Sequence, residues 1–321
     1  MQGGRIALVV LLAVACGDRS EHGPEQAPKP TTPTGAASGD PWGAPPPARD
    51  EAPPNPTRPL EHPFVWVAEK DGHATTLLGT LHAGFDAKDR LPLWVWKRLE
   101  NAKTLVVEAD PLDPELSSWT MRAPGSPTLR EELGEEYWAK LVDLMGRKQL
   151  AMNGLSSTAM VAAQISGYGN RVEATLAMDF ALLGRAKKLD KAIVYLERAK
   201  AQGAMLTAQF SLEALKLLID RHEDLPRINR AFFRAYEDGD AQTFDALGRE
   251  SFSKQVPDYA AHQRLIAQLL TDRNRAWLPV IEELHAKGEA FIAVGALHLV
   301  GEGSVLDLLL ERGYRIRRLY E

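Results

Sequence analysis

The apolar residues of this chain fall into short unbroken runs and into longer stretches with a helical period. The run 290–294 contains no polar residue, which predicts a strand buried on both faces of a sheet. Gly295 ends this run, and His298 follows just past it. A capping-box pattern then predicts a helix over 305–312, and a returning strand is expected over 314–319. The pattern therefore predicts a β-loop-α-β unit near the C-terminus.

A second stretch has the same layout of an apolar strand, Gly-x-x-His and a further glycine. The turn dipeptide Asp71-Gly72 separates the runs 64–68 and 75–78, which predicts a hairpin. The second strand of this hairpin leads to His82. In open α/β sheets ligands bind beyond the carboxyl ends of the strands, so both histidines are candidates for a site.

Two further strand-like, mainly apolar stretches are each followed by an acid. Glu108 follows the run 104–107, and Glu197 follows the run 191–196. Such an acid is either solvated at the end of its strand or buried with a cation or a hydrogen-bond donor as partner. Glu108 is therefore a candidate site residue, and Glu197 has the same position at the end of its strand.

Most of the remaining chain has helical periodicity. A helix is expected from Pro92 to about Ala102, and further helices over 131–150, 156–166, 171–188, 199–220, 225–238, 241–252 and 259–286. This order predicts an α/β domain over 62–321 with a central, mostly parallel or mixed sheet flanked by helices. The segments of about 111–189 and 199–286 are expected to form a helical insertion between the two sheet-forming ends.

If the strands are parallel neighbours, His82, Glu108 and His298 converge on one rim of the sheet. Two imidazoles and a carboxylate form a ligand set suited to Zn²⁺, Mn²⁺, Co²⁺ or Fe²⁺. A metal there would polarise a carbonyl and lower the pKa of bound water, as hydrolysis requires. Without a metal, the same residues form a His/Glu general acid–base pair. In a purely structural interpretation, the histidines only bind loop carbonyls.

Composition places the folded part among globular proteins. The chain has 321 residues, of which 45% are hydrophobic and 25% charged, and its net charge is −5. Because the chain is not basic, nucleic acid has no electrostatic support as a partner. No pattern specifies an oligomeric state.

The N-terminus predicts export. Residues 1–15 have one positive charge before ten apolar residues, which is typical of a signal peptide. Cys16 follows a lipobox-like Leu-Ala-Val-Ala and is the only cysteine of the chain, which favours lipid attachment there over cleavage to a soluble secreted protein. Residues 16–61 are rich in proline, glycine and alanine and are expected to be a disordered tether. We therefore expect a bacterial envelope protein that is lipid-anchored and faces the periplasm or the exterior.

Several of these stretches together resemble the TraB/GumN family. They are Leu-Leu-Gly-Thr-Leu-His82-Ala-Gly, Leu-Val-Val-Glu108-Ala-Asp and Phe-Ile-Ala-Val-Gly-Ala-Leu-His298-Leu-Val-Gly, and Met178-Asp179, Leu196-Glu197 with Gln202, and Arg273-Asn274 follow in family order. The resemblance covers about 62–321. The family includes the TIKI proteases and is distantly similar to the haem-binding ChaN proteins and to erythromycin esterases.

The resemblance implies a site and a class of activity. It makes His82 and His298 the paired motif histidines and Glu108 their acid, with Glu197 and Arg273 as further polar members of the pocket. Arg273 would orient the acids or bind a substrate carboxylate or oxyanion. The TIKI-like members imply divalent-cation-dependent proteolysis.

We therefore expect a membrane-tethered, metal-dependent hydrolase acting on peptides or proteins. His82 and His298 would bind Mn²⁺, Co²⁺ or Zn²⁺, Glu108 would be a ligand or general base, and Arg273 would stabilise developing negative charge. The alternative is a haem- or metal-binding envelope lipoprotein without catalysis, and a third possibility is a tethered scaffold with a vestigial site.

Overall fold

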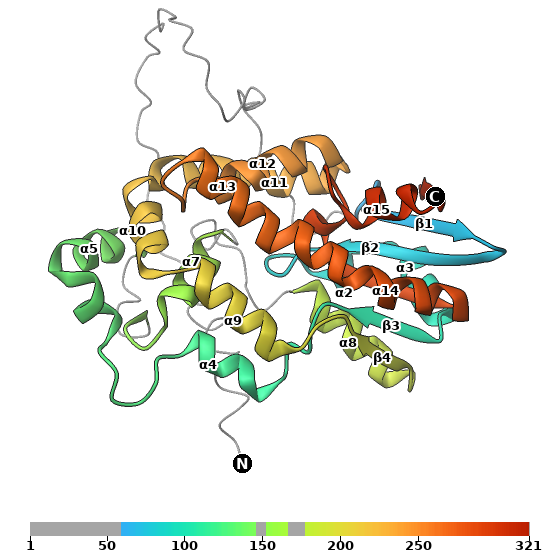
Figure 1. Cartoon of the computed structure of the whole chain (residues 1–321), viewed down its shortest axis with the longest axis horizontal. Helices are drawn as coiled ribbons and strands as arrows, with labels where there is room; N and C mark the ends of the chain where they lie inside the picture. Colours follow the sequence, from blue (N-terminus) through green and yellow to red (C-terminus); the bar gives the residue numbers. More distant parts are fainter. Residues whose placement is uncertain (1–58, 146–151, 166–176, 321) are drawn as a thin grey trace, which may run out of the picture.

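The computed structural model describes residues 59–145, 152–165 and 177–320 (Figure 1). Within these residues six strands form one sheet in the order β4-β3-β5-β2-β1-β6. All strands are parallel except β1, which is antiparallel to both of its neighbours. The prediction of an α/β fold with a mixed, mostly parallel sheet is confirmed. The strands are β1 (Val65–Lys70), β2 (His73–Thr80), β3 (Thr104–Val107), β4 (Ala192–Tyr195), β5 (Ala290–Gly295) and β6 (Arg315–Arg318).

Helices and helical turns connect and cover these strands. They are α2 (Ala87–Arg90), α3 (Leu93–Asn101), η1 (Pro114–Leu116), α4 (Ser117–Thr120), α5 (Leu129–Met145), α7 (Ser157–Ile165), α8 (Met178–Lys188), α9 (Ala199–Gln209), α10 (Leu212–Asp220), η3 (His222–Asp224), α11 (Leu225–Asp238), α12 (Ala241–Ser253), α13 (Tyr259–Ile266), the π turn η4 (Ala267–Thr271), α14 (Asp272–Lys287), η5 (Ala296–His298) and α15 (Val305–Glu311). Parts of the helices expected over 131–150 and 171–188 lie outside the described residues.

The β1–β2 hairpin forms as the turn dipeptide predicts. Asp71 and Gly72 have φ angles of 50° and 79°, the left-handed pair of a tight hairpin turn, and Lys70 pairs with His73 across it. β5 is buried along its whole length between β3 and β2, in agreement with its unbroken apolar run. After α15 the chain returns as β6, which pairs with β1 at the edge of the sheet.

Two expected helices are interrupted. The segment expected as one helix over 199–220 forms α9 and α10, because the Ser211 side chain accepts a hydrogen bond from the Ala214 N–H and caps a new helix there. The segment expected over 259–286 contains the π turn η4 between α13 and α14. In this turn the N–H of Asp272 bonds to the carbonyl of Ala267, five residues earlier.

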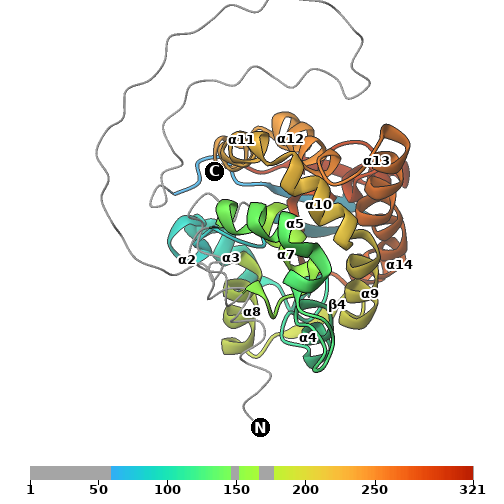
Figure 2. The same cartoon turned by 90° about the vertical axis from the view of Figure 1, so that its left-hand side faces the viewer.

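The buried side chains form two hydrophobic clusters. The first contains the sheet with residues of α3, α8, α14 and α15, and the second contains residues of α5, α7, α10 and α13. In Figure 1 the sheet lies on the right and α5, α7 and α10 on the left; Figure 2 looks onto these helices from that side. Thus α8 and α14, although within the expected helical insertion, pack against the sheet.

The expected N-terminal features precede the described part. The signal peptide (1–15), Cys16 and the tether up to residue 58 lie outside the described residues. In the part of the chain that the structure describes, no helix combines the length and the apolar character that crossing a membrane requires.

Candidate active site

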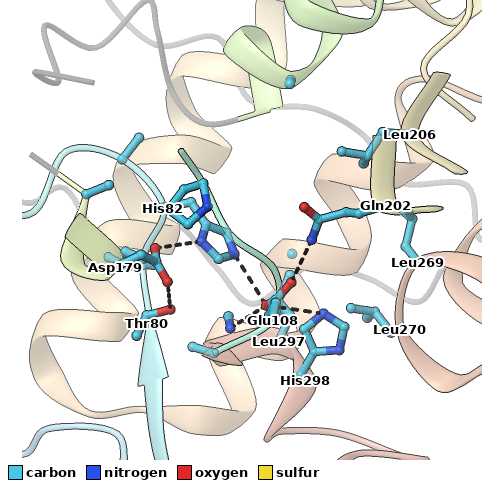
Figure 3. Close-up of a pocket in the computed structure, with 18 of the residues that line it drawn as sticks. Thr80, His82, Glu108, Asp179, Gln202, Leu206, Leu269, Leu270, Leu297 and His298 are labelled. Carbon is cyan, nitrogen blue, oxygen red and sulfur yellow. Dashed lines mark hydrogen bonds and ion pairs between the residues drawn. The ribbon is translucent and has the colours of Figure 1, made fainter. Parts of the chain in front are cut away.

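Three neighbouring parallel strands bring His82, Glu108 and His298 together. The ends of β2 and β3 flank the end of β5, and each of the three residues lies just past one of these ends. Oε1 of Glu108 is 3.6 Å from Nε2 of His82 and 3.7 Å from Nε2 of His298 (Figure 3). The strand-end pattern of the sequence thus identified residues that share one location.

Arg273, from the first turn of α14, joins this group. Its side chain is 13% exposed. A guanidinium has five N–H donors, and each has a partner: Nη2 donates to Glu108 Oε2 (2.6 Å) and Glu197 Oε1 (2.6 Å), Nε to Glu197 Oε2 (3.3 Å), and Nη1 to the Leu269 carbonyl (2.9 Å) and His298 Nε2 (3.0 Å). No N–H is left for a substrate carboxylate or an oxyanion, so the geometry supports the orienting role of Arg273.

The π turn places Arg273 in this position. It changes the helical register immediately before α14, and the Leu269 carbonyl within it accepts from the guanidinium. The guanidinium also lies over the ring of Trp277, 4.7 Å from its centroid. Leu269 and Leu270 of the same turn line the adjacent cavity. The π turn therefore positions Arg273 in the polar cluster and also contributes two leucines to the cavity wall.

Glu108 is an ionised carboxylate held on several sides. Its Oε1 accepts from the Gly295 N–H (2.7 Å), and Nε2 of Gln202 donates to its Oε2 (3.3 Å) and to Glu197 Oε1 (3.0 Å). Burial alone would raise the pKa of Glu108, but the Arg273 cation and the neighbouring imidazoles hold this pKa well below its usual range. Glu108 is therefore a fixed negative charge and a weak base.

His298 is a neutral imidazole. The Asn274 amide donates through Nδ2 to the Gly303 carbonyl (2.9 Å), so its Oδ1 accepts the Nδ1–H of His298 (2.6 Å). Nε2 of His298 then accepts from Arg273. Burial lowers the pKa of His298 to about 3, and the charge of Arg273 adds to this effect. Both ring nitrogens are thus occupied by the protein.

His82 is the imidazole that faces the cavity. Its Nδ1 is 2.9 Å from Oδ2 of Asp179, whose Oδ1 accepts from Thr80 Oγ1 (3.3 Å). The side chain is 56% exposed and lines the cavity. Desolvation alone would lower the pKa of His82, but the Asp179 and Glu108 carboxylates outweigh it and raise this pKa to about 9. Nε2 therefore carries a proton below about pH 9, and its lone pair becomes available once the ring is neutral.

Asp179, Gln202 and Asn274 are site residues that the residue pattern alone did not identify. Asp179 is an acid in the first turn of α8, where the helix dipole is sufficient reason for a carboxylate. In the sequence these three residues were noted only for their order in the family resemblance. Their contacts with His82, Glu108 and His298 join positions 24 to 97 residues apart, such as Asp179 with His82 and Asn274 with His298.

The cluster opens into a cavity of about 420 Å³. The ends of the strands supply the polar residues Thr80, His82, Glu108 and His298, and helices add others, among them Asp179, Gln202 and Arg273. The remaining lining is mostly aromatic and aliphatic and comes from helices. A cavity of this size with a few convergent polar groups is typical of a small-molecule or substrate site.

The donor set does not fit a metal ion in this arrangement. Within 59–145, 152–165 and 177–320, no three or more His, Cys, Asp and Glu side chains are grouped so as to hold one. The reason is chemical, because the lone pair of His298 Nε2 and Oε2 of Glu108 both accept from Arg273. The expected divalent ion and the alternative haem remain predictions.

Comparison with known proteins covers the whole described fold. The model of the TraB/PrgY/gumN family matches residues 64–318, a range that contains every member of the polar cluster. The uncharacterized protein YbaP of Shigella flexneri is 31% identical over 258 residues, which are 77% of this chain and 92% of that protein. The uncharacterized protein YbaP of Escherichia coli (strain K12) is 31% identical over 244 residues, 73% of this chain and 86% of that protein.

Proposed function

The chain belongs to the TraB/PrgY/gumN family, and from this membership and the geometry of its polar cluster we propose that it is a hydrolase of ester or amide bonds with His82 as general base. The observation that carries the proposal is the His82–Asp179 pair. Nδ1 faces the Asp179 carboxylate, and Nε2 on the other side of the ring lies 3.6 Å from Glu108 Oε1 at the cavity, with its lone pair available when the ring is neutral.

In the proposed hydrolysis, His82 first accepts a proton from water and then donates it to the leaving group. A water molecule beside Nε2 of His82 attacks the carbonyl carbon of the substrate and gives a proton to Nε2. Asp179 and Glu108 stabilise the imidazolium that forms, since both carboxylates favour the charged ring. The same proton then passes to the leaving oxygen or nitrogen as its bond to the carbonyl carbon breaks. The products are a carboxylic acid and an alcohol or amine.

The other cluster members act through position. Arg273 holds Glu108 and Glu197, and His298 with Asn274 holds Arg273. The low pKa of Glu108 suits a stabilising charge better than a general base. The resemblance to the TIKI proteases implies a divalent ion instead. Its ligands would include Glu108 and His298, which in this structure accept hydrogen bonds from Arg273.

A Gly295→Ala substitution tests the proposal. An added Cβ would lie 2.7 Å from His82 Nε2 and 3.1 Å from Glu108 Oε1. Gly295 has φ −49° and ψ 134°, which alanine adopts without strain, so the backbone tolerates the methyl group while the end of His82 is displaced and Glu108 shifts by a few tenths of an ångström. We expect hydrolysis of p-nitrophenyl esters and of peptide anilides to fall about 100-fold, with the melting temperature little changed.

The control is Gly184→Ala, in α8, where an added Cβ meets no atom within 4 Å. This variant should keep the activity of the wild type. Both proteins are assayed after dialysis against a chelator. If full activity survived in Gly295→Ala, His82 would not be the base. Activity lost on chelation and restored by Mn²⁺ or Co²⁺ would instead support the metal-dependent alternative.

We also propose that the protein is exported and lipid-anchored through Cys16. The proposal rests on the apolar segment of residues 1–15 and on the absence of any second cysteine in the sequence. In bacteria that express the full chain, Cys16→Ser should shift the protein from the membrane fraction to the soluble fraction and abolish labelling with radioactive palmitate. A wild-type protein that is soluble and unlabelled would favour secretion without a lipid.

A further inference from the structure

We propose that the substrate of this site carries a bulky, uncharged, apolar acyl group, and that the cavity beside His82 binds that group. The inference rests on the proposed function, because it assigns the scissile carbonyl to the position next to Nε2 of His82. It goes further by naming the kind of molecule that the cavity accepts.

The cavity wall beyond the polar cluster is apolar. Helices from different parts of the chain contribute aromatic and aliphatic side chains to it, among them Phe180, Leu206, Phe233, Phe252, Leu270 and Leu297. Burial of such surface by a ligand is favourable roughly in proportion to the apolar area covered. A volume of about 420 Å³ holds a group much larger than an acetyl.

The apolar wall is continuous with the catalytic residues. Figure 3 shows Leu206, Leu269, Leu270 and Leu297 around the side of the cluster formed by Gln202 and His298. Leu297 is held in place against α12, since a Cβ added at Gly248 would lie only 2.6 Å from it. His82 lines the same cavity as these leucines, so binding of an apolar group and reaction at His82 share one cavity.

Charge excludes an acidic substrate. All charged side chains among the described lining residues belong to the polar cluster, namely His82, Glu108, Asp179 and Arg273. Glu197 is not among the lining residues, but it accepts hydrogen bonds from Arg273 and so adds a further carboxylate to the cluster. Three carboxylates thus face one guanidinium and at most one imidazolium, which leaves the cluster negative. A neutral acyl group is therefore favoured over one that ends in a carboxylate.

Uncharged apolar acyl groups occur both in lipid-like esters and in peptides with apolar side chains. The first experiment measures kcat/KM of the full chain for p-nitrophenyl acetate, butyrate, octanoate and hemisuccinate, and for acyl-Ala and acyl-Phe p-nitroanilides. We expect a gain of about 3-fold for each added methylene and the lowest value for the hemisuccinate. Preference for octanoate indicates a lipid-like ester, and preference for the Phe anilide indicates a peptide.

A narrowing variant locates the group in the cavity. Leu206→Trp should lower the ratio of the octanoate to the acetate kcat/KM about 10-fold, because the larger ring occupies the apolar wall. The matched control is Leu310→Trp, at a position on α15 that is 52% exposed, which should leave the ratio unchanged. A ratio that does not change in Leu206→Trp would overturn the placement of the acyl group.

Binding without turnover separates this inference from the proposed function. Calorimetry with 2-butanone and 2-octanone, which carry a carbonyl but no leaving group, should show tighter binding of the longer ketone to both wild type and His82→Ala. If the longer ketone binds more tightly but no ester or amide is cleaved, the hydrolase proposal fails and the apolar cavity stands. If chain length changes neither binding nor rate, or if the hemisuccinate is preferred, the inference is overturned.

Discussion

Replacement of Arg273 by methionine is expected to lower the free energy of unfolding by about 3–5 kcal/mol. Its side chain is 13% exposed, and those of its partners Glu108 and Glu197 are 9% and 17% exposed. Methionine fills a similar volume but leaves two buried carboxylates without their cation. It also removes the donor to His298 Nε2. Urea denaturation of the purified chain measures the change.

Arg275 provides the matched control because it lies on the same helix and is 64% exposed, with Asp272 as its ion-pair partner. Arg275→Met should change the free energy of unfolding by about 0.5 kcal/mol or less. Arg273→Lys should recover only part of the loss, since an ammonium cannot reproduce the planar set of five donors. Equal stability of Arg273→Met and the wild type would show that the cluster does not depend on this cation.

Replacement of His82 by alanine is expected to lower kcat/KM for ester hydrolysis by about 100- to 10,000-fold. The expected loss follows from the role of Nε2 as the proton acceptor. Because the side chain lies at the cavity and is 56% exposed, the fold should retain its melting temperature. His73→Ala, at an exposed position of the β1–β2 hairpin, is the control and should retain activity. A His82→Ala variant as active as the wild type would exclude this histidine as the base.

The pH profile distinguishes a base from an acid at this position. Against the opposing effect of desolvation, Asp179 and Glu108 raise the pKa of His82 to about 9. A general base must be neutral, and its neutral fraction rises with pH, so kcat/KM should increase up to about pH 9 and then level off. Asp179→Asn removes a carboxylate that raises this pKa and should move the rising limb to lower pH. A rate that falls as pH approaches 9 would make His82 an acid instead.

Part of this site could be predicted from the sequence because strand ends are local features. An unbroken apolar run predicts a buried strand, and the residue that follows it lies at the edge of the sheet. This reasoning identified His82, Glu108 and His298, and in the structure Oε1 of Glu108 lies 3.6 Å from Nε2 of His82 and 3.7 Å from Nε2 of His298. The hairpin at Asp71-Gly72 followed from its turn residues in the same way.

Arg273 and Glu197 entered the sequence analysis by resemblance, and their contacts needed the fold. A helical arginine and a strand-end acid are common features of solvated surfaces. The π turn before Arg273 and the helix break at Ser211 involve local hydrogen bonds that differ from those of a regular helix, and hydrophobic periodicity does not predict them.

The sequence by itself therefore determined the strands, the class of fold and the strand-end residues, since each depends on neighbours a few positions away. Only the tertiary structure decided which imidazole is available. In the folded protein Nδ1 of His82 lies beside Asp179, 97 residues away in the sequence, whereas Nε2 of His298 accepts a hydrogen bond from Arg273. The tertiary structure also encloses the apolar cavity between the helices and the sheet. These contacts join distant segments that pack together to bury apolar surface, and no local pattern specifies which segments meet.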